Sequence, residues 1–190
     1  MILKELKIAR GYNPKTQKLV GLFAAQLDDQ LVRLKNHTKD LTVKQLEWQL
    51  KPGMNTIGML LAHLALVEIF WTKVAPSGMK WDPDGKKVIK KICGFKDDGL
   101  PLSPKGKHPS YLKKYSAKKY LAILDKARRT IHAEMKKWKD NDLNKKFNLA
   151  NRKFTYSWTL YHILEHFAAH FGQILLLKHM MKDAGVLKGK

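Results

Sequence analysis

Residues 158–177 read WTLYHILEHFAAHFGQILLL, and this stretch decides the fold of the chain. It contains no Pro and a single Gly, and apolar residues fall on nearly every side of the helix that it predicts. Such a helix belongs inside a helical bundle, because a surface helix keeps one polar face. Three histidines, His162, His166 and His170, recur every four residues and therefore share one stripe of this helix.

This histidine stripe allows two interpretations. Side chains four residues apart on a helix lie roughly 5–6 Å apart at Cβ, so two neighbouring imidazoles can hold one metal ion. A histidine on an apolar face is more commonly a core side chain with one hydrogen bond, and the spacing also arises by chance. Burying several imidazoles without partners costs roughly 1–3 kcal/mol each, which favours a shared ion. A metal site would then need a ligand from another helix.

A second apolar helix, predicted over residues 57–74, offers that ligand. Four of its residues share one stripe: Leu60, His63, Val67 and Phe70. His63 is therefore expected to point inward, either as a ligand or as a core histidine with a hydrogen bond.

Apolar periodicity predicts four helices, over residues 16–36, 57–74, 116–138 and 155–183. Residues 1–15 form an irregular lead-in, a short helical turn follows Thr42, and residues 139–154 form a polar connection. Residues 77–115 are rich in Pro and Gly and form a long excursion between the second and third helices, expected to wall or cover a pocket. We therefore predict one domain over residues 1–190, an all-α four-helix bundle with long connections.

The chain is strongly basic, with 37 Lys and Arg against 16 Asp and Glu and a net charge of +21. This charge favours binding to polyanions, with nucleic acid first and an anionic membrane second. Two features favour a solvated surface instead. Arginine, the usual bidentate reader of bases and phosphates, is scarce, and the lysines are scattered along the whole chain. Nucleic-acid binding is therefore expected to be non-specific and sensitive to salt.

A single cysteine, Cys93, and a beginning without a hydrophobic leader predict a cytoplasmic protein. The longest apolar run, residues 57–71, is interrupted by His63 and Glu68 and is judged too short and too polar to span a membrane. Cys93 lies in the excursion without an assigned base, which makes it a poor candidate for a nucleophile.

His63 from the second helix, with His166 and His170 from the last, forms a candidate three-histidine metal site. Three neutral imidazoles leave at least one open coordination position, which is typical of a catalytic site. Such a set fits Zn²⁺, Ni²⁺, Fe²⁺ or Mn²⁺ and does not choose among them. Gln173, one turn beyond His170, is expected to bond a bound water or to orient a ligand.

Several polar residues are candidates for supporting roles: Asp28, Asp29, Glu68, Glu165, Asp97, Asp98 and His108. The last three lie in the excursion, where turn-forming carboxylates and an exposed histidine are the simpler interpretation. His132 lies beside the apolar stripe of the third helix and is predicted at the surface, not at the site.

Two segments carry a resemblance to a known family. NTIGMLLAHLALVEIFW, residues 55–71, resembles the second-helix motif of the DinB-like superfamily, and YHILEHFAAHFGQI, residues 161–174, is similar to its last-helix motif. The stretch DDGLPLSPKGKHPSYL, residues 97–112, resembles the long connection of one branch of these proteins. The resemblance covers about residues 17–180. The family's ligand histidines match His63, His166 and His170, whereas His162 matches no ligand.

The resemblance implies a four-helix bundle, often a homodimer, with a divalent metal in a cleft. Characterised relatives include transferases and isomerases that use low-molecular-weight thiols such as bacillithiol or mycothiol. We therefore expect a metal-dependent enzyme of the thiol-transferase or hydrolase type acting on a small-molecule substrate. The ion would lower the pKa of a bound water towards about 7 or hold a substrate thiol as thiolate. The alternative is a basic nucleic-acid-binding or DNA-damage-related module whose metal site is structural or vacant.

Overall fold

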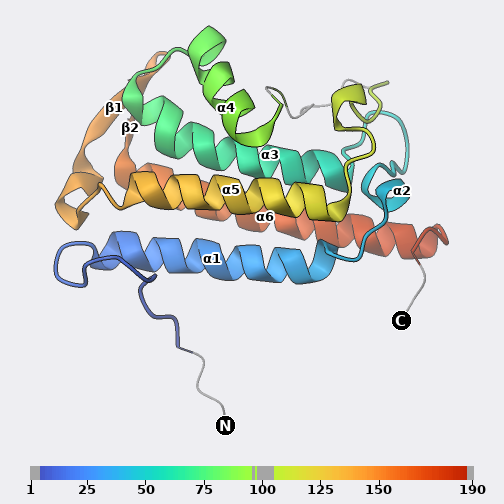
Figure 1. Cartoon of the computed structure of the whole chain (residues 1–190), viewed down its shortest axis with the longest axis horizontal. Coiled ribbons are helices and arrows are strands. Elements are labelled where there is room, and N and C mark those ends of the chain that lie inside the picture. Colours follow the sequence, from blue (N-terminus) through green and yellow to red (C-terminus); the bar gives the residue numbers. More distant parts are fainter. Residues whose placement is uncertain (1–4, 96, 98–104, 188–190) are drawn as a thin grey trace.

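The computed structural model describes residues 5–95, 97 and 105–187 and is mostly helical. Its four longest helices lie side by side along the long axis of the molecule (Figure 1): α1 (Lys18–Thr38), α3 (Ile57–Ile69), α5 (Ala117–Met135) and α6 (Tyr156–Asp183). Helix α3 packs against α5 and α6, and α1 packs against the same two helices. The predicted helical fold is confirmed.

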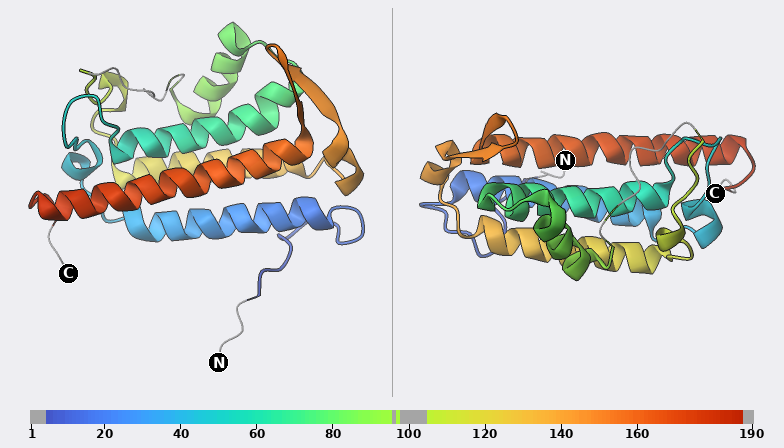
Figure 2. Two further views of the ribbon diagram at one scale, coloured as in Figure 1. Left: turned by 180° about the vertical axis from the view of Figure 1, so that it is seen from behind. Right: turned by 90° about the horizontal axis from the view of Figure 1, so that it is seen from above.

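Shorter elements join these helices: α2 (Val43–Leu46), η1 (Phe70–Val74), η2 (Ala75–Ser77), η3 (Trp81–Gly85), α4 (Lys86–Cys93), η4 (Ser110–Leu112), η5 (Asp140–Asn144), β1 (Lys146–Leu149) and β2 (Arg152–Thr155). Figure 2 shows that α4 and the hairpin of β1 and β2 lie outside the four long helices. The hairpin is antiparallel and pairs Lys146 with Thr155 and Phe147 with Phe154.

Side-chain caps explain where several helices begin. A hydroxyl oxygen accepts a hydrogen bond from a backbone N–H of the first turn at four residues: Thr42, Thr56, Ser116 and Thr155. Such a cap satisfies one of the N–H groups that the first turn leaves without a partner. These caps agree with the predicted starts of the second, third and fourth helices.

Helix α4 was not predicted, because residues 77–115 were expected to lack a helix. Its sequence KKVIKKIC places Ile89 and Cys93 on one buried side and lysines on the other. At eight residues it is too short for its pattern to stand out among the surrounding Pro and Gly. A helix of this length is stabilised by burial against α3 and α5 and not by its own propensity.

The large apolar side chains of the excursion fall into three groups. Phe95 is buried, and Trp81 packs against Phe70 with 5.3 Å between ring centroids. Tyr111 is exposed and lies outside the buried core. Leu100 and Leu102 lie outside the described residues.

Residues 139–154 were predicted to be a polar connection, yet they contain η5, β1 and most of β2. Two aromatic side chains of this hairpin, Phe147 and Phe154, stack with their centroids 5.8 Å apart. Phe154 also contacts Trp71 and Trp158 of the helices. The strands are four residues each, so alternation of polar and apolar residues is too brief to identify them.

The helical stretch Ile57–Ser77 is long and apolar enough to cross a bilayer by length and composition alone. This stretch is longer than the apolar run of residues 57–71, because η1 and η2 prolong α3. A buried core helix passes the same test of length and composition. Its apolar character has another cause: 78% of the apolar window is buried inside the protein. This stretch serves as the core helix of the fold.

A buried ion pair joins the central helices. The Glu68 carboxylate on α3 accepts hydrogen bonds from Nη2 and Nε of Arg128 on α5, at 2.5 and 3.3 Å. Arg128 also donates to Asp28 on α1 at 3.2 Å, and Asp28 lies 2.9 Å from Nε2 of His132. The predicted surface position of His132 is wrong, since this network keeps it half-buried.

Replacing Arg128 with Met is expected to lower the free energy of unfolding by about 3–5 kcal/mol, because the Glu68 carboxylate would stay buried without its partner. Chemical denaturation measures this change. The matched control is Arg129→Met, at an exposed neighbouring position, which should change stability by less than about 0.5 kcal/mol. Equal losses in the two variants would contradict a structural role for the buried pair.

Candidate metal centre

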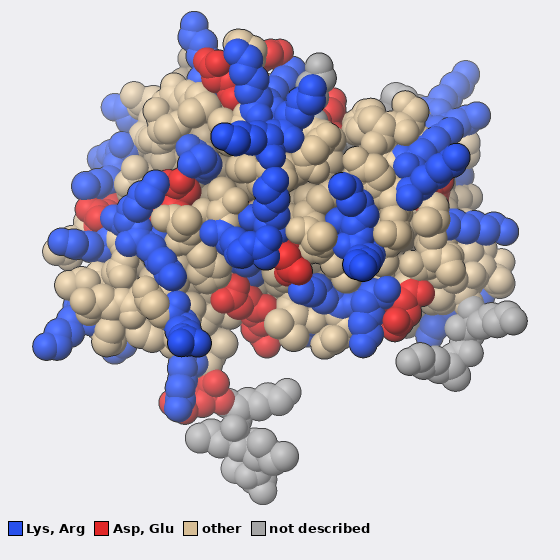
Figure 3. All heavy atoms as spheres, viewed as in Figure 1, with Lys and Arg blue, Asp and Glu red and all other residues tan. Residues whose placement is uncertain are grey.

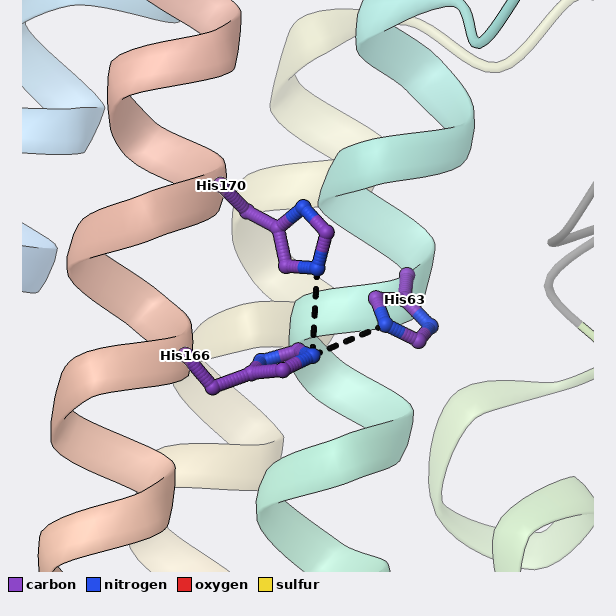
Figure 4. A group of neighbouring side chains, drawn as sticks. All are labelled: His63, His166 and His170. Atoms are coloured by element: carbon purple, nitrogen blue, oxygen red, sulfur yellow. Dashed lines mark hydrogen bonds between the residues drawn. The ribbon is translucent and has the colours of Figure 1, made fainter.

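Three histidines from two helices converge in the structure (Figure 4). His63 projects from α3 and meets His166 and His170, which project from α6. The Nε2 atom of His166 lies 3.0 Å from Nε2 of His63 and 3.1 Å from Nε2 of His170. One nitrogen of each ring lies within 4.8 Å of the other two. The tertiary structure thus brings together the three residues that the sequence nominated as metal ligands.

His63 differs from every other residue of α3. Of the 13 residues in this helix, 12 are buried, and only His63 is half-buried. His166 and His170 are half-buried as well and lie one turn apart on α6. The three rings therefore lie at a partly exposed place between α3 and α6.

The protonation state of His166 suits a metal ligand. Burial, together with the nearby His170, His63 and His162, lowers its pKa from the ordinary value of 6.5 to about 3. The imidazole is consequently neutral at pH 7. A neutral ring nitrogen with a free lone pair is the form that binds metal ions.

The donor set fits a divalent ion. Zinc–nitrogen bonds of about 2.0–2.1 Å at tetrahedral angles place two ligand nitrogens roughly 3.3 Å apart. The two Nε2–Nε2 distances of 3.0 and 3.1 Å lie within a few tenths of an ångström of this value. Within the described part of the chain, this group contains histidines alone, so its three donors are uncharged. One coordination position would remain for a substrate or water.

Gln173 supports the orientation of one ring. Its side-chain Oε1 lies 2.8 Å from Nδ1 of His170. Because an amide oxygen only accepts hydrogen bonds, Nδ1 carries the ring proton and Nε2 presents its lone pair towards His166. A contact of this kind is what the sequence led us to expect of Gln173.

His162 does not join the group, although it continues the same stripe. Its ring stacks on Trp158 with centroids 4.6 Å apart and meets Trp71 edge-on at 5.0 Å. Its Nδ1 lies 3.0 Å from Oε1 of Glu165. Sequence reasoning missed the resulting aromatic wall, because Trp71 and Trp158 lie on different helices and meet only after folding.

The other candidate supporting residues lie elsewhere. Glu68 and Asp28 belong to the buried network around Arg128, and Asp29 and Asp97 are exposed. Asp98 lies outside the described residues.

His108 and Cys93 are buried away from the histidine group. His108 pairs through Nδ1 with Oγ1 of Thr56 at 2.8 Å, at the start of α3. Burial raises the pKa of the Cys93 thiol to about 12. The thiol is therefore protonated at neutral pH, which agrees with the prediction that it is a poor nucleophile.

The charge of the chain is spread over its surface. Lys and Arg side chains cover much of the face shown in Figure 3, with Asp and Glu side chains between them. On this face the basic side chains are spread out and do not gather along one segment. Nucleic-acid binding therefore stays a prediction that rests on charge alone.

Comparison with known proteins bears on the fold and the family. A solved structure, of a DinB-like protein from Bacillus cereus ATCC 10987, is similar at a TM-score of 0.54 and 21% sequence identity. The match covers 94% of this chain and all of that chain, and at this identity it shows a shared fold. No curated protein matches. A family model described as the DinB superfamily matches residues 26–174, which include all three converging histidines, and the chain therefore belongs to the DinB superfamily.

Proposed function

We propose that His63, His166 and His170 bind one divalent metal ion and that the protein is a metal-dependent enzyme of the thiol-transferase or hydrolase type. The convergence of three histidine nitrogens within 4.8 Å of one another carries this proposal. The Nε2 atoms of His63 and His170 both approach Nε2 of His166, at 3.0 and 3.1 Å, and neutral imidazole nitrogens are common ligands of divalent metal ions.

Both reaction types place the same demand on the site. A divalent ion supplies Lewis acidity, which activates water as a nucleophile or holds a thiol as thiolate. The chain contributes the three neutral donors, and Gln173 holds His170 in one tautomer. We further propose a small-molecule substrate, a low-molecular-weight thiol as co-substrate, a homodimer and a cytoplasmic location. Zn²⁺, Ni²⁺, Fe²⁺ and Mn²⁺ all suit the donor set.

Elemental analysis of the purified, untagged protein is expected to find about one divalent ion per chain. The His63→Ala and His166→Ala variants should lose it, because two imidazoles hold such an ion far less tightly than three. His179→Ala, at an exposed histidine of the same helix, is the matched control and should keep the metal. Wild-type protein that stays metal-free after reconstitution would overturn the proposal.

Replacing Gln173 with Ala is expected to weaken metal affinity about 10- to 100-fold, because His170 would lose the acceptor that fixes its orientation. Competition with a chromogenic chelator measures the affinity. Glu165→Ala is the control, since Glu165 contacts His162 and not the converging group. An unchanged affinity in the Gln173 variant would remove this residue from the proposed site.

The metal-free protein is expected to lose stability as the pH falls from 7 to 5. Folding lowers the pKa of His166 from 6.5 to about 3. Between these two pH values the unfolded chain is protonated at this ring and the folded protein is not, so acidification favours the unfolded chain. Stability present above pH 6.5 is therefore lost on acidification. His108, whose burial also lowers its pKa, adds to this slope.

Melting temperatures measured across this range check the assignment. The slope should become shallower in His166→Leu and stay unchanged in the control His179→Leu. A slope unaffected by His166→Leu would contradict the depressed pKa.

A further inference from the structure

A cavity of about 290 Å³ lies next to the converging histidines, between α3, α6 and the chain that leads into α3. Six of the residues that line it are Asn55, Leu60, Gln173, Leu176, Leu177 and Met180. Its position is on the C-terminal side of the histidine group along α6. The aromatic wall of Trp71 and Trp158 lies on the N-terminal side.

Two residues connect this cavity to the histidine group. Leu60 precedes His63 by three residues on α3, and Gln173 follows His170 by three residues on α6. Three residues of helix rise roughly 4.5 Å, so the cavity begins about one turn from the donors on both helices. Gln173 belongs to both places, because its Oε1 contacts Nδ1 of His170.

The lining of the cavity is uncharged and mostly apolar. Leucine and methionine dominate it, and no Lys, Arg, Asp or Glu occurs among the described residues that line it. This is unusual in a chain of 37 basic residues. An uncharged, apolar hollow favours an apolar group over a charged one. Its volume lies at the lower end of ligand pockets, which run from about 300 to 1,000 Å³.

We propose that this cavity receives the unbranched apolar chain of a small-molecule substrate whose polar head is held at His63, His166 and His170. The inference rests on the proposed metal site and names the class of substrate for it. The flexible methionines of the lining suit a chain that bends, since a thioether side chain adapts its shape to its neighbour.

Two hydroxamic acids with the same metal-binding head test the proposal. Acetohydroxamic acid and hexanohydroxamic acid differ by four methylenes, and each is titrated calorimetrically into protein reconstituted with Zn²⁺. A fully buried methylene strengthens binding about fourfold, equivalent to ~0.8 kcal/mol. With partial burial, hexanohydroxamic acid is expected to bind at least tenfold more tightly.

A variant that fills the cavity provides a second test of the proposal. Leu176 lines the cavity and is 54% exposed, so Leu176→Trp can narrow the cavity without overpacking the core. We expect it to reduce the preference for hexanohydroxamic acid below about threefold while leaving acetohydroxamic acid unaffected. Tyr161→Trp is the matched control on the same helix, at a residue that is 56% exposed and does not line the cavity; it should keep the preference.

The outcomes separate the two proposals. Equal affinities for the two hydroxamic acids in the unaltered protein would overturn the cavity while leaving the metal site in place. No binding of either would overturn the metal site and, with it, the cavity as a substrate site. A third outcome would also overturn the cavity as a substrate site. In it, benzohydroxamic acid binds more tightly than acetohydroxamic acid, whereas hexanohydroxamic acid does not. Trp158→Leu then removes the gain for benzohydroxamic acid, and Leu176→Trp does not. The apolar part would then lie on the aromatic wall.

Discussion

The burial of α3 is the constraint on which the rest of the structure depends. Twelve of its 13 residues are buried, and it packs against α5 and α6. An apolar helix must be covered on all sides, so the neighbouring helices have to surround it. Helix α1, which contacts α5 and α6, likewise buries Leu27, Leu31 and Leu34 on its inner side.

Polar side chains on such an apolar helix need partners. Two polar side chains of α3, Glu68 and His63, differ in how far they are exposed. Glu68 is buried and satisfied by Arg128, in an ion pair that joins two helices and is closed to solvent. His63 is half-buried and faces two other imidazoles. Buried polar groups without partners are costly, so both arrangements have to be complete in the folded state. The difference in exposure is what distinguishes a structural pair from a site where chemistry can occur. The cavity beside Leu60 and Gln173 lies between the same two helices. Its lining and the histidine site both result from how α3 packs against α6.

Helix starts and the histidine trio were predictable because their signals are local. The hydroxyl caps at Thr56, Ser116 and Thr155 lie beside the turns that they satisfy, and the stripe of His166 and His170 follows from helical spacing. Helix α4 and the hairpin were missed for the opposite reason. Their apolar residues are few, and burial against other elements stabilises them. His132 was misplaced because nothing in its neighbourhood along the chain indicates its partner Asp28, 104 residues away.

The sequence by itself determined the helical class, the approximate ends of the four long helices and the identity of the three candidate ligands. Periodicity and capping are properties of neighbouring residues, so they need no knowledge of distant contacts. Only the tertiary structure decided what His162, the histidine of the α6 stripe outside this trio, contacts instead and what adjoins the group. His162 points into the aromatic wall, whereas His166 and His170 face His63. The direction in which each of these rings points depends on how α6 is rotated about its axis relative to α3. The rotation is set by packing between residues about 100 positions apart, which a pattern within one helix does not contain.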